Sequence, residues 1–143
     1  MDFARIFEFI GNHPYLILAF VGTLGALFAS EIVRRVNGMK SVGPAQATSL
    51  SNRENAVFLD TREDREYNDG HIPEAVHIPL KQLPERAAEL GRYKKYPIVA
   101  YCRSGNRSSS TGRILKKHGF ENVYNLAGGI MAWQSANLPV SKK

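Results

Sequence analysis

The chain's only cysteine lies between a run typical of a buried β-strand and a run typical of an α-helix. Residues 97–101, directly before Cys102, are apolar and partly β-branched, as in a strand of a parallel sheet. Residues 109–118 carry apolar positions at helical spacing, and Gly119 follows as a helix stop. This order predicts a strand, a tight loop and a helix, with Cys102 at the carboxyl edge of a parallel sheet.

The same alternation extends over much of the chain. Expected strands lie near residues 57–60, 76–78, 98–101 and 123–126, and expected helices near residues 44–51, 83–90, 108–118 and 129–136. This alternation indicates an α/β fold in which helices flank a mainly parallel central sheet. Because no internal repeat is visible, we expect one compact domain there.

The loop after the cysteine has the composition of an anion-binding site. Backbone N–H groups in such a loop, with the first turn of the following helix, form a concavity of partial positive charge. A sulfur there is stabilised as thiolate, and the two arginines are expected to add to this effect. We therefore predict a nucleophilic Cys102, rather than an inert buried cysteine, with an anion-binding loop of Arg103, Ser104, Gly105, Asn106, Arg107 and Ser108.

Three groups of residues occur in a characteristic order along the chain. They are Leu-Asp-Thr-Arg at 59–62 with Glu66, Tyr67, Gly-His-Ile-Pro-Glu-Ala at 70–75 and Ile-Pro at 78–79; Cys-Arg-Ser-Gly-Asn-Arg-Ser at 102–108; and Gly119, Phe120, Val123, Leu126, Gly128, Gly129, Ala132, Trp133 and Leu-Pro-Val at 138–140. Together these motifs resemble the rhodanese family of sulfurtransferases. The resemblance implies a rhodanese-like domain of the single-domain type.

Two positions depart from the family's pattern. Glu74 stands where a glycine usually follows Ile-Pro, and Asn137 where a glycine usually precedes the final Leu-Pro. Asparagine accepts the left-handed backbone conformation almost as glycine does, so Asn137 is a mild change. Glutamate does not, and we expect the turn at Glu74 to avoid positive φ.

The resemblance also implies a mechanism. The Cys102 thiolate attacks the outer sulfur of a small anionic donor, such as thiosulfate, and holds it as a covalent persulfide without any further cofactor. Since no second cysteine is present to form an internal disulfide, the sulfur passes to a thiol or protein acceptor. At the end of the strand 57–60, Asp60 and Arg62 are expected to support the loop or a neighbouring helix.

Other chemistry at this cysteine is also compatible with the sequence. A phosphatase or arsenate reductase would use the same thiolate, although the C-x4-R spacing is one residue shorter than the C-x5-R phosphatase loop. A third alternative is a docking module without catalysis. The four histidines have no metal-ligand spacing, so we predict no metal, and Trp133 lies at helical spacing from Ile130, as a core residue would.

The N-terminal part contains a long apolar segment. Residues 9–30 carry no charge, and residues 15–29 are almost wholly apolar, near the roughly 17 to 25 residues that span a bilayer. We predict one transmembrane helix within residues 1–36, a linker at 37–43 and the rhodanese-like domain at 44–143. A stripe of small residues, Gly22, Ala26 and Ser30, could pack two copies into a homodimer.

Two alternatives fit this segment less well. A signal peptide has a positive start and a small-residue cleavage site, whereas Asp2, Arg5 and Glu8 carry little net positive charge. A buried soluble helix of this apolarity needs a larger core than one small domain offers.

Charge predicts the orientation and one class of partner. Arg34, Arg35 and Lys40 follow the apolar segment, so the positive-inside rule predicts an inner (cytoplasmic) membrane protein with its catalytic domain in the cytoplasm. The formal net charge of +6 fits attraction to anionic lipid headgroups. We expect no nucleic-acid binding, because no continuous basic stripe with stacking aromatic residues is present.

Overall fold

The structure is a computed structural model that describes residues 11–37 and 39–142 of the chain, with the side chains of residues 32–37 excepted. Predictions that involve Asp2, Arg5, Glu8, Phe9, Gly38 or Lys143 therefore lie outside the described residues, as do the side chains of Arg34 and Arg35. The chain divides into two compact units, Met1–Asn37 and Gly38–Lys143, and each is described by itself.

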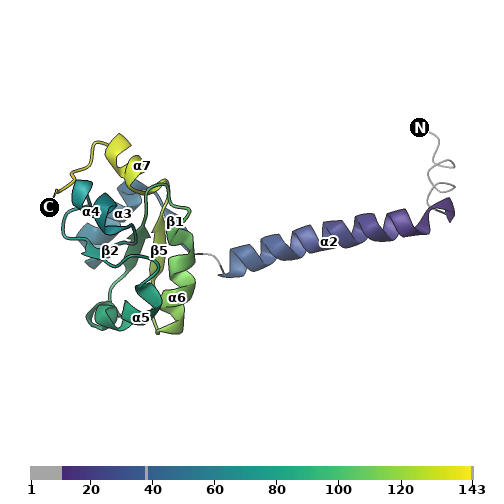
Figure 1. Ribbon diagram of the computed structural model, residues 1–143, viewed down its shortest axis with the longest axis horizontal. Coiled ribbons are helices and arrows are strands. Elements are labelled where there is room, and N and C mark those ends of the chain that lie inside the picture. Colours follow the sequence, from purple (N-terminus) through teal and green to yellow (C-terminus); the bar gives the residue numbers. More distant parts are fainter. Residues whose placement is uncertain (1–10, 38, 143) are drawn as a thin grey trace. The chain divides into compact units, whose positions relative to one another are not determined.

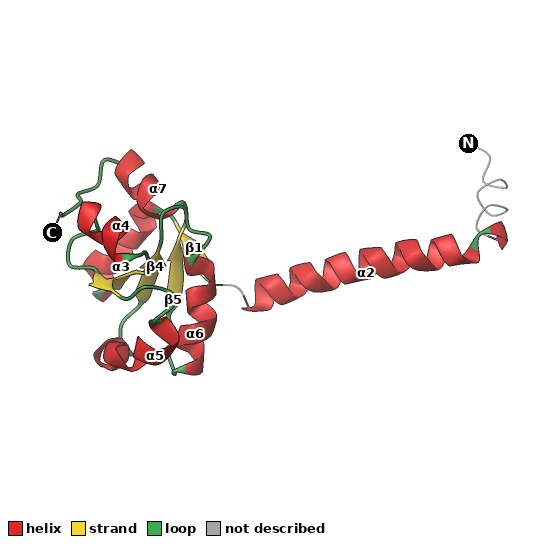
Figure 2. Cartoon of the chain, in the orientation of Figure 1, coloured by secondary structure: helices red, strands yellow, loops and turns green. Residues whose placement is uncertain are grey.

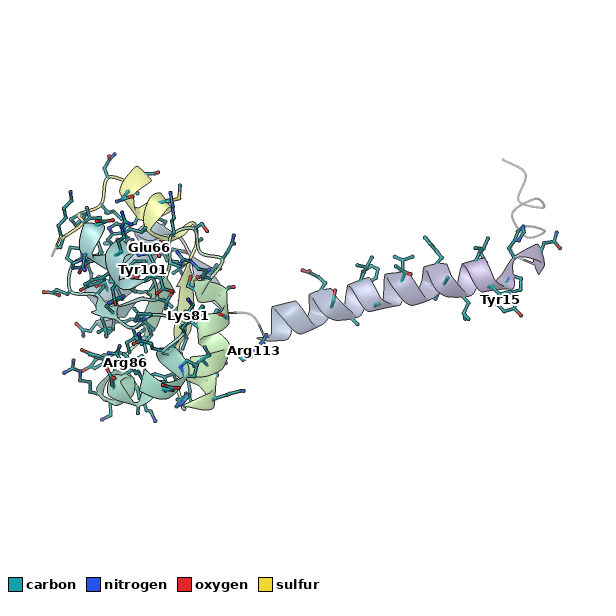
Figure 3. All side chains as sticks on the ribbon, viewed as in Figure 1. Tyr15, Glu66, Lys81, Arg86, Tyr101 and Arg113 are labelled. Carbon is teal, nitrogen blue, oxygen red and sulfur yellow. The ribbon has the colours of Figure 1, made fainter. Side chains whose placement is uncertain are left out.

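The first unit contains one long helix, α2, which spans Pro14–Asn37. Its segment Pro14–Glu31 is long and apolar enough to cross a membrane, and none of that segment is buried within the protein. Large apolar side chains are exposed there, including Tyr15 at 86% and Leu18 at 73%, and Tyr15 is labelled in Figure 3. This exposure differs from that of a core helix in a soluble domain, whereas a signal sequence would share the same length and composition.

The second unit is built on a five-stranded sheet (Figure 2). The strands are β1 (Lys40–Val42), β2 (Val57–Asp60), β3 (Val76–His77), β4 (Ile98–Tyr101) and β5 (Val123–Leu126). Their order is β1-β5-β4-β2-β3, and every neighbouring pair is parallel. The predicted α/β fold with a parallel central sheet is therefore confirmed, and the central strand β4 is buried along its whole length.

Helices cover both faces of the sheet (Figure 1). They are α3 (Pro44–Glu54), α4 (Asp64–Asp69), α5 (Leu83–Arg86), the 3-10 helices η1 (Ala87–Tyr93) and η2 (Ser108–Ser110), α6 (Thr111–Lys117) and α7 (Gly129–Ser135). One apolar core lies on the side of α3 and α7, and a second lies on the side of α5, η1 and α6. Trp133 belongs to the first core, where its ring packs edge-to-face against Phe58 at 5.1 Å, so its predicted core position is confirmed.

Three elements differ from the prediction. Part of the expected linker forms β1, whose residues pair with β5 from Lys40 opposite Tyr124 to Val42 opposite Leu126. A three-residue edge strand with one buried side chain has no apolar run by which to recognise it. Helix α4 was not predicted because none of its residues is buried, and the helix expected over 83–90 continues as 3-10 helix after Arg86.

The turn that contains Glu74 was wrongly predicted. Glu74 has φ 61°, in the left-handed region, and the N–H of Ala75 closes the turn onto the carbonyl of Ile72 at 3.1 Å. The residue therefore adopts a left-handed conformation that costs a non-glycine residue about 1 kcal/mol. Asn137 adopts φ 55°, as its side chain allows.

Candidate active site

Cys102 follows the last residue of the central strand β4, at the carboxyl edge of the sheet. The end of that strand is fixed by Thr61, whose N–H and hydroxyl both donate to the carbonyl of Tyr101, at 3.0 and 2.9 Å. Only 1% of the surface of Cys102 is exposed. Its sulfur is therefore surrounded by protein groups, and their chemistry decides its ionisation.

The loop supplies hydrogen-bond donors to this sulfur. The N–H of Gly105 donates to the Cys102 Sγ at 3.1 Å, and the Ser108 hydroxyl lies 3.5 Å from it. Burial acts to raise the pKa of the Cys102 thiol, but hydrogen bonds from Ser108 and from the backbone of Ser104 and Gly105 outweigh burial and lower the pKa. The loop thus favours the thiolate mainly through its hydrogen bonds.

The two arginines of the loop have different surroundings. Arg107 forms a two-point ion pair with Glu66 of α4, at 2.8 Å between Nη2 and Oε1 and 3.1 Å between Nη1 and Oε2. The hydrogen bond from Arg107 is the main reason that the pKa of Glu66 is lowered, while Glu66 and, less strongly, Cys102 raise the pKa of Arg107. Arg103 is exposed and forms no ion pair with any residue that the structure describes.

Asp60 and Arg62 form a buried pair behind α4. The Arg62 guanidinium donates to the Asp60 carboxylate, with the shortest contact at 2.6 Å, and also to the carbonyl of Gly70 at 2.7 Å. Burial acts to lower the pKa of Arg62, but the hydrogen bond and charge of Asp60 outweigh it and raise the pKa. Since Gly70 ends α4, the pair holds this neighbouring helix rather than the loop itself.

Stacked rings hold the same helix from another side. Tyr67 lies between the imidazoles of His71 and His77, with ring centroids 3.8 and 4.3 Å away. Tyr67 directly follows Glu66, so this stack fixes the part of α4 that carries the partner of Arg107. Both histidines thus have packing roles in this structure, and no group of three potential ligands suited to a metal occurs among residues 11–37 and 39–142.

Gly129 allows the start of α7 to lie directly against the loop. The N–H groups of Ile130 and Met131 donate to the carbonyls of Cys102 and Arg103, at 2.9 and 3.2 Å. Gly129, at φ 55°, approaches so closely that a Cβ would overlap the Cys102 carbonyl. The loop is therefore held by the start of α7 as well as by β4, and a glycine is required at this contact.

A recess opens beside the loop, between α4 and α7. It measures about 390 Å³ and is lined by Arg62, Glu66, Asp69, Gly70, Arg103, Ile130, Met131 and Gln134. Arg103 and Asp69 give it opposite charges, and Met131, which is 52% exposed, gives it an apolar wall. The recess offers space for a reactant beside Arg103, the residue that directly follows Cys102.

A family model described as the Rhodanese-like domain matches residues 43–136. The chain belongs to the rhodanese-like domain family. It is 29% identical to "Uncharacterized protein YibN" of Escherichia coli strain K12, over 95% of this chain and 96% of that protein. It is 37% identical to a protein of Allochromatium vinosum named "Sulfurtransferase", over 64% of this chain and 83% of that one. A crystal structure of a rhodanese-related protein from Thermoplasma volcanium has TM-score 0.65 and 27% identity, covering 73% of this chain and 99% of that one.

The site of this rhodanese-like domain contains residues that the sequence did not single out. The structure brings Gly105 and Ser108 to the sulfur of Cys102, places Asp60 and Arg62 behind α4, and leaves the side chain of Asn106 exposed. The missed residues are Glu66, Asn125 and Gly129. Glu66 and Gly129 belong to the quoted motifs, and the signal for Asn125 is that it is the only amide side chain in its strand, beside Val123, Tyr124 and Leu126.

Proposed function

We propose that this rhodanese-like protein is a membrane-anchored sulfurtransferase that carries sulfane sulfur on Cys102. The main support is the Gly105 N–H at 3.1 Å from the Cys102 Sγ, in a loop whose hydrogen bonds lower the pKa of the thiol. Such donors are in place before reaction and would stabilise both the thiolate and the terminal sulfur of a persulfide. The name of the Allochromatium vinosum relative agrees with this activity.

The proposed cycle has two half-reactions. The thiolate attacks the outer sulfur of thiosulfate, a sulfur–sulfur bond forms on Cys102, and the original one breaks with its electron pair leaving on sulfite. A thiophilic acceptor then takes the outer sulfur, and the thiolate returns. With cyanide as acceptor the product is thiocyanate; in the cell the acceptor is a thiol or a protein.

The state of Arg107 favours this chemistry over phosphate-ester hydrolysis. A phosphatase would use this arginine to bind a whole phosphoryl group, but both of its terminal nitrogens contact Glu66. Transfer of one sulfur atom depends less on the Arg107 guanidinium, because the loop N–H groups suffice to stabilise a single anionic atom.

Membrane attachment through α2 is the second part of the proposal. The segment Pro14–Glu31 has the length and apolarity of a membrane span, and the similarity to YibN extends over 95% of the chain, so it includes this region. We place the protein in the inner membrane as a single-pass protein with its catalytic domain in the cytoplasm, where a lone cysteine stays reduced. Membrane fractions of cells, washed with carbonate, should retain the full chain and release one that lacks residues 1–37.

Intact-protein mass measurement tests the activity directly. After incubation with thiosulfate, wild-type protein should gain one sulfur atom, which cyanide removes, and Cys102→Ser should gain none. A wild type that gains no sulfur but hydrolyses a phosphate ester would make the protein a phosphatase. Full complementation of a deletion by Cys102→Ala would instead identify docking as the main function.

A further inference from the structure

The Ser108 hydroxyl lies within reach of three hydrogen-bond acceptors but can donate to only one of them. Its oxygen lies 2.6 Å from the Asn125 Oδ1, 3.3 Å from the Gly105 carbonyl and 3.5 Å from the Cys102 Sγ. A hydroxyl carries one proton, so only one of these acceptors receives a strong hydrogen bond. The shortest distance assigns the proton to Asn125 while Cys102 is a neutral thiol, and the hydroxyl then points away from the sulfur.

Ionisation of the cysteine changes which acceptor is strongest. A thiolate or persulfide anion accepts a hydrogen bond more strongly than an amide oxygen does. If the hydroxyl turned to the sulfur and nothing else moved, the Asn125 Oδ1 would lose its donor. Asn125 is 7% exposed and Ser108 is fully buried, so water could not easily replace that bond.

The side chain of Asn125 can resolve this conflict by a half-turn. The amide carries its acceptor on one side and its donors on the other, so a half-turn brings Nδ2 to the Ser108 oxygen, which then accepts while it donates to the sulfur. In the structure, before any half-turn, the Asn125 Nδ2 donates to the hydroxyl of Ser41 in β1 at 3.5 Å. Because a hydroxyl can donate as well as accept, Ser41 can serve the amide in both orientations.

We propose that Asn125 is a positioning residue whose side-chain amide turns over when Cys102 becomes anionic, and that it thereby directs the Ser108 hydroxyl to the sulfur. The part that concerns the persulfide rests on the proposed function, whereas the part that concerns the thiolate does not. Among the charged groups beside the sulfur, Arg107 interacts electrostatically with Cys102 and is paired with Glu66, and Arg103 directly follows Cys102; all three are unchanged in every variant below.

Alkylation of the single cysteine measures this coupling without any sulfur donor. The rate with iodoacetamide, followed against pH, gives the pKa of the only thiol. Asn125→Asp places a group that only accepts at neutral pH, so the Ser108 proton stays on that side. We expect about tenfold slower alkylation at neutral pH, corresponding to a pKa about one unit higher. Asn125→Ala removes the competing acceptor and leaves the hydroxyl free to donate to the sulfur, so its rate should fall much less than that of Asn125→Asp.

A double-mutant cycle separates the hydroxyl from simple charge. In a Ser108→Ala background, Asn125→Asp should lose most of its effect. Asn122→Asp adds the same charge at an exposed position before β5 and should leave the rate unchanged. An equal effect of Asn125→Asp with and without Ser108 would overturn the proposal, as would an Asn125→Ala variant that slows alkylation as much as Asn125→Asp.

A measurement on wild-type protein avoids any failure of variants to fold. The side-chain amide signals of Asn125 in an NMR titration should shift with the same midpoint as the alkylation profile. Signals that do not change would refute the turnover. If the Asn125 amide responds to ionisation of Cys102 but no persulfide forms, only the proposed sulfurtransferase function is contradicted. If a persulfide forms but the amide does not respond, only the role of Asn125 is contradicted.

Discussion

Glu66→Gln tests whether Arg107 binds the anionic sulfur donor. Both terminal nitrogens of Arg107 are engaged by the Glu66 carboxylate, so an anion that uses this guanidinium must first displace that carboxylate. Glutamine keeps the shape of the side chain and removes its charge. The variant should therefore release the guanidinium for the donor and remove a negative charge from the recess beside the loop.

The structure sets the size of this effect. The Glu66 and Arg107 side chains are 30% and 45% exposed, so solvent screens their attraction, while the two-point geometry strengthens it. We assign the pair about 1 kcal/mol. Since 1.36 kcal/mol corresponds to a tenfold ratio, kcat/KM for thiosulfate should rise about fivefold in the variant. The free energy of unfolding should fall by no more than about 1 kcal/mol.

Thiocyanate formation from thiosulfate and cyanide gives this ratio. Glu89→Gln is the matched control, because Glu89 forms a similar two-point pair with Arg86, at 2.7 and 3.0 Å. Arg86 is the last residue of α5 and lies away from Glu66 (Figure 3), so the control should change stability slightly and kcat/KM not at all. If kcat/KM of Glu66→Gln is unchanged or lower, Arg107 does not bind the donor and the reasoning is wrong.

Two further predictions concern stability. Gly129→Ala combines a positive φ with overlap against the Cys102 carbonyl, so thermal unfolding should show a loss of about 2 kcal/mol or more; Gly91→Ala, where a Cβ meets open space, should be nearly neutral. The pKa of Glu66 is lowered from 4.5, so its pair stabilises the folded state above pH 4.5, and this contribution is lost as the pH falls through the lower folded-state pKa. Urea unfolding at several pH values should show this loss in wild type, and a Glu66→Gln variant with the same acid dependence would contradict it.

The local part of the fold was predictable because it follows from short apolar runs. β2, β4 and β5 were placed on their observed residues. Each is a largely buried strand of a parallel sheet, so in the sequence it is a short, mainly apolar run rather than an alternation of apolar and polar residues. β1 and α4 were not, because a three-residue edge strand and a helix without buried residues carry no apolar pattern. Glu74 shows a different limit, since the turn fixes its φ at 61° whatever its side chain prefers.

The same division holds for the candidate site. The position of Cys102 between a strand and a helix predicted a sulfur near backbone N–H groups, and the Gly105 N–H lies at 3.1 Å. The expectation that both arginines face an anion did not include Glu66, which is 41 residues from Arg107 in sequence and contacts it only after α4 is folded against the sheet. Likewise, Ser108 and Asn125 meet only because β4 and β5 are neighbouring strands.

The sequence by itself determined the α/β class, the place of the nucleophile and the apolar segment, because each depends on residues close together in the chain. Only the tertiary structure decided which groups surround the sulfur and which charges are already paired. Those contacts join strands and helices far apart in sequence, and their geometry depends on how the elements pack.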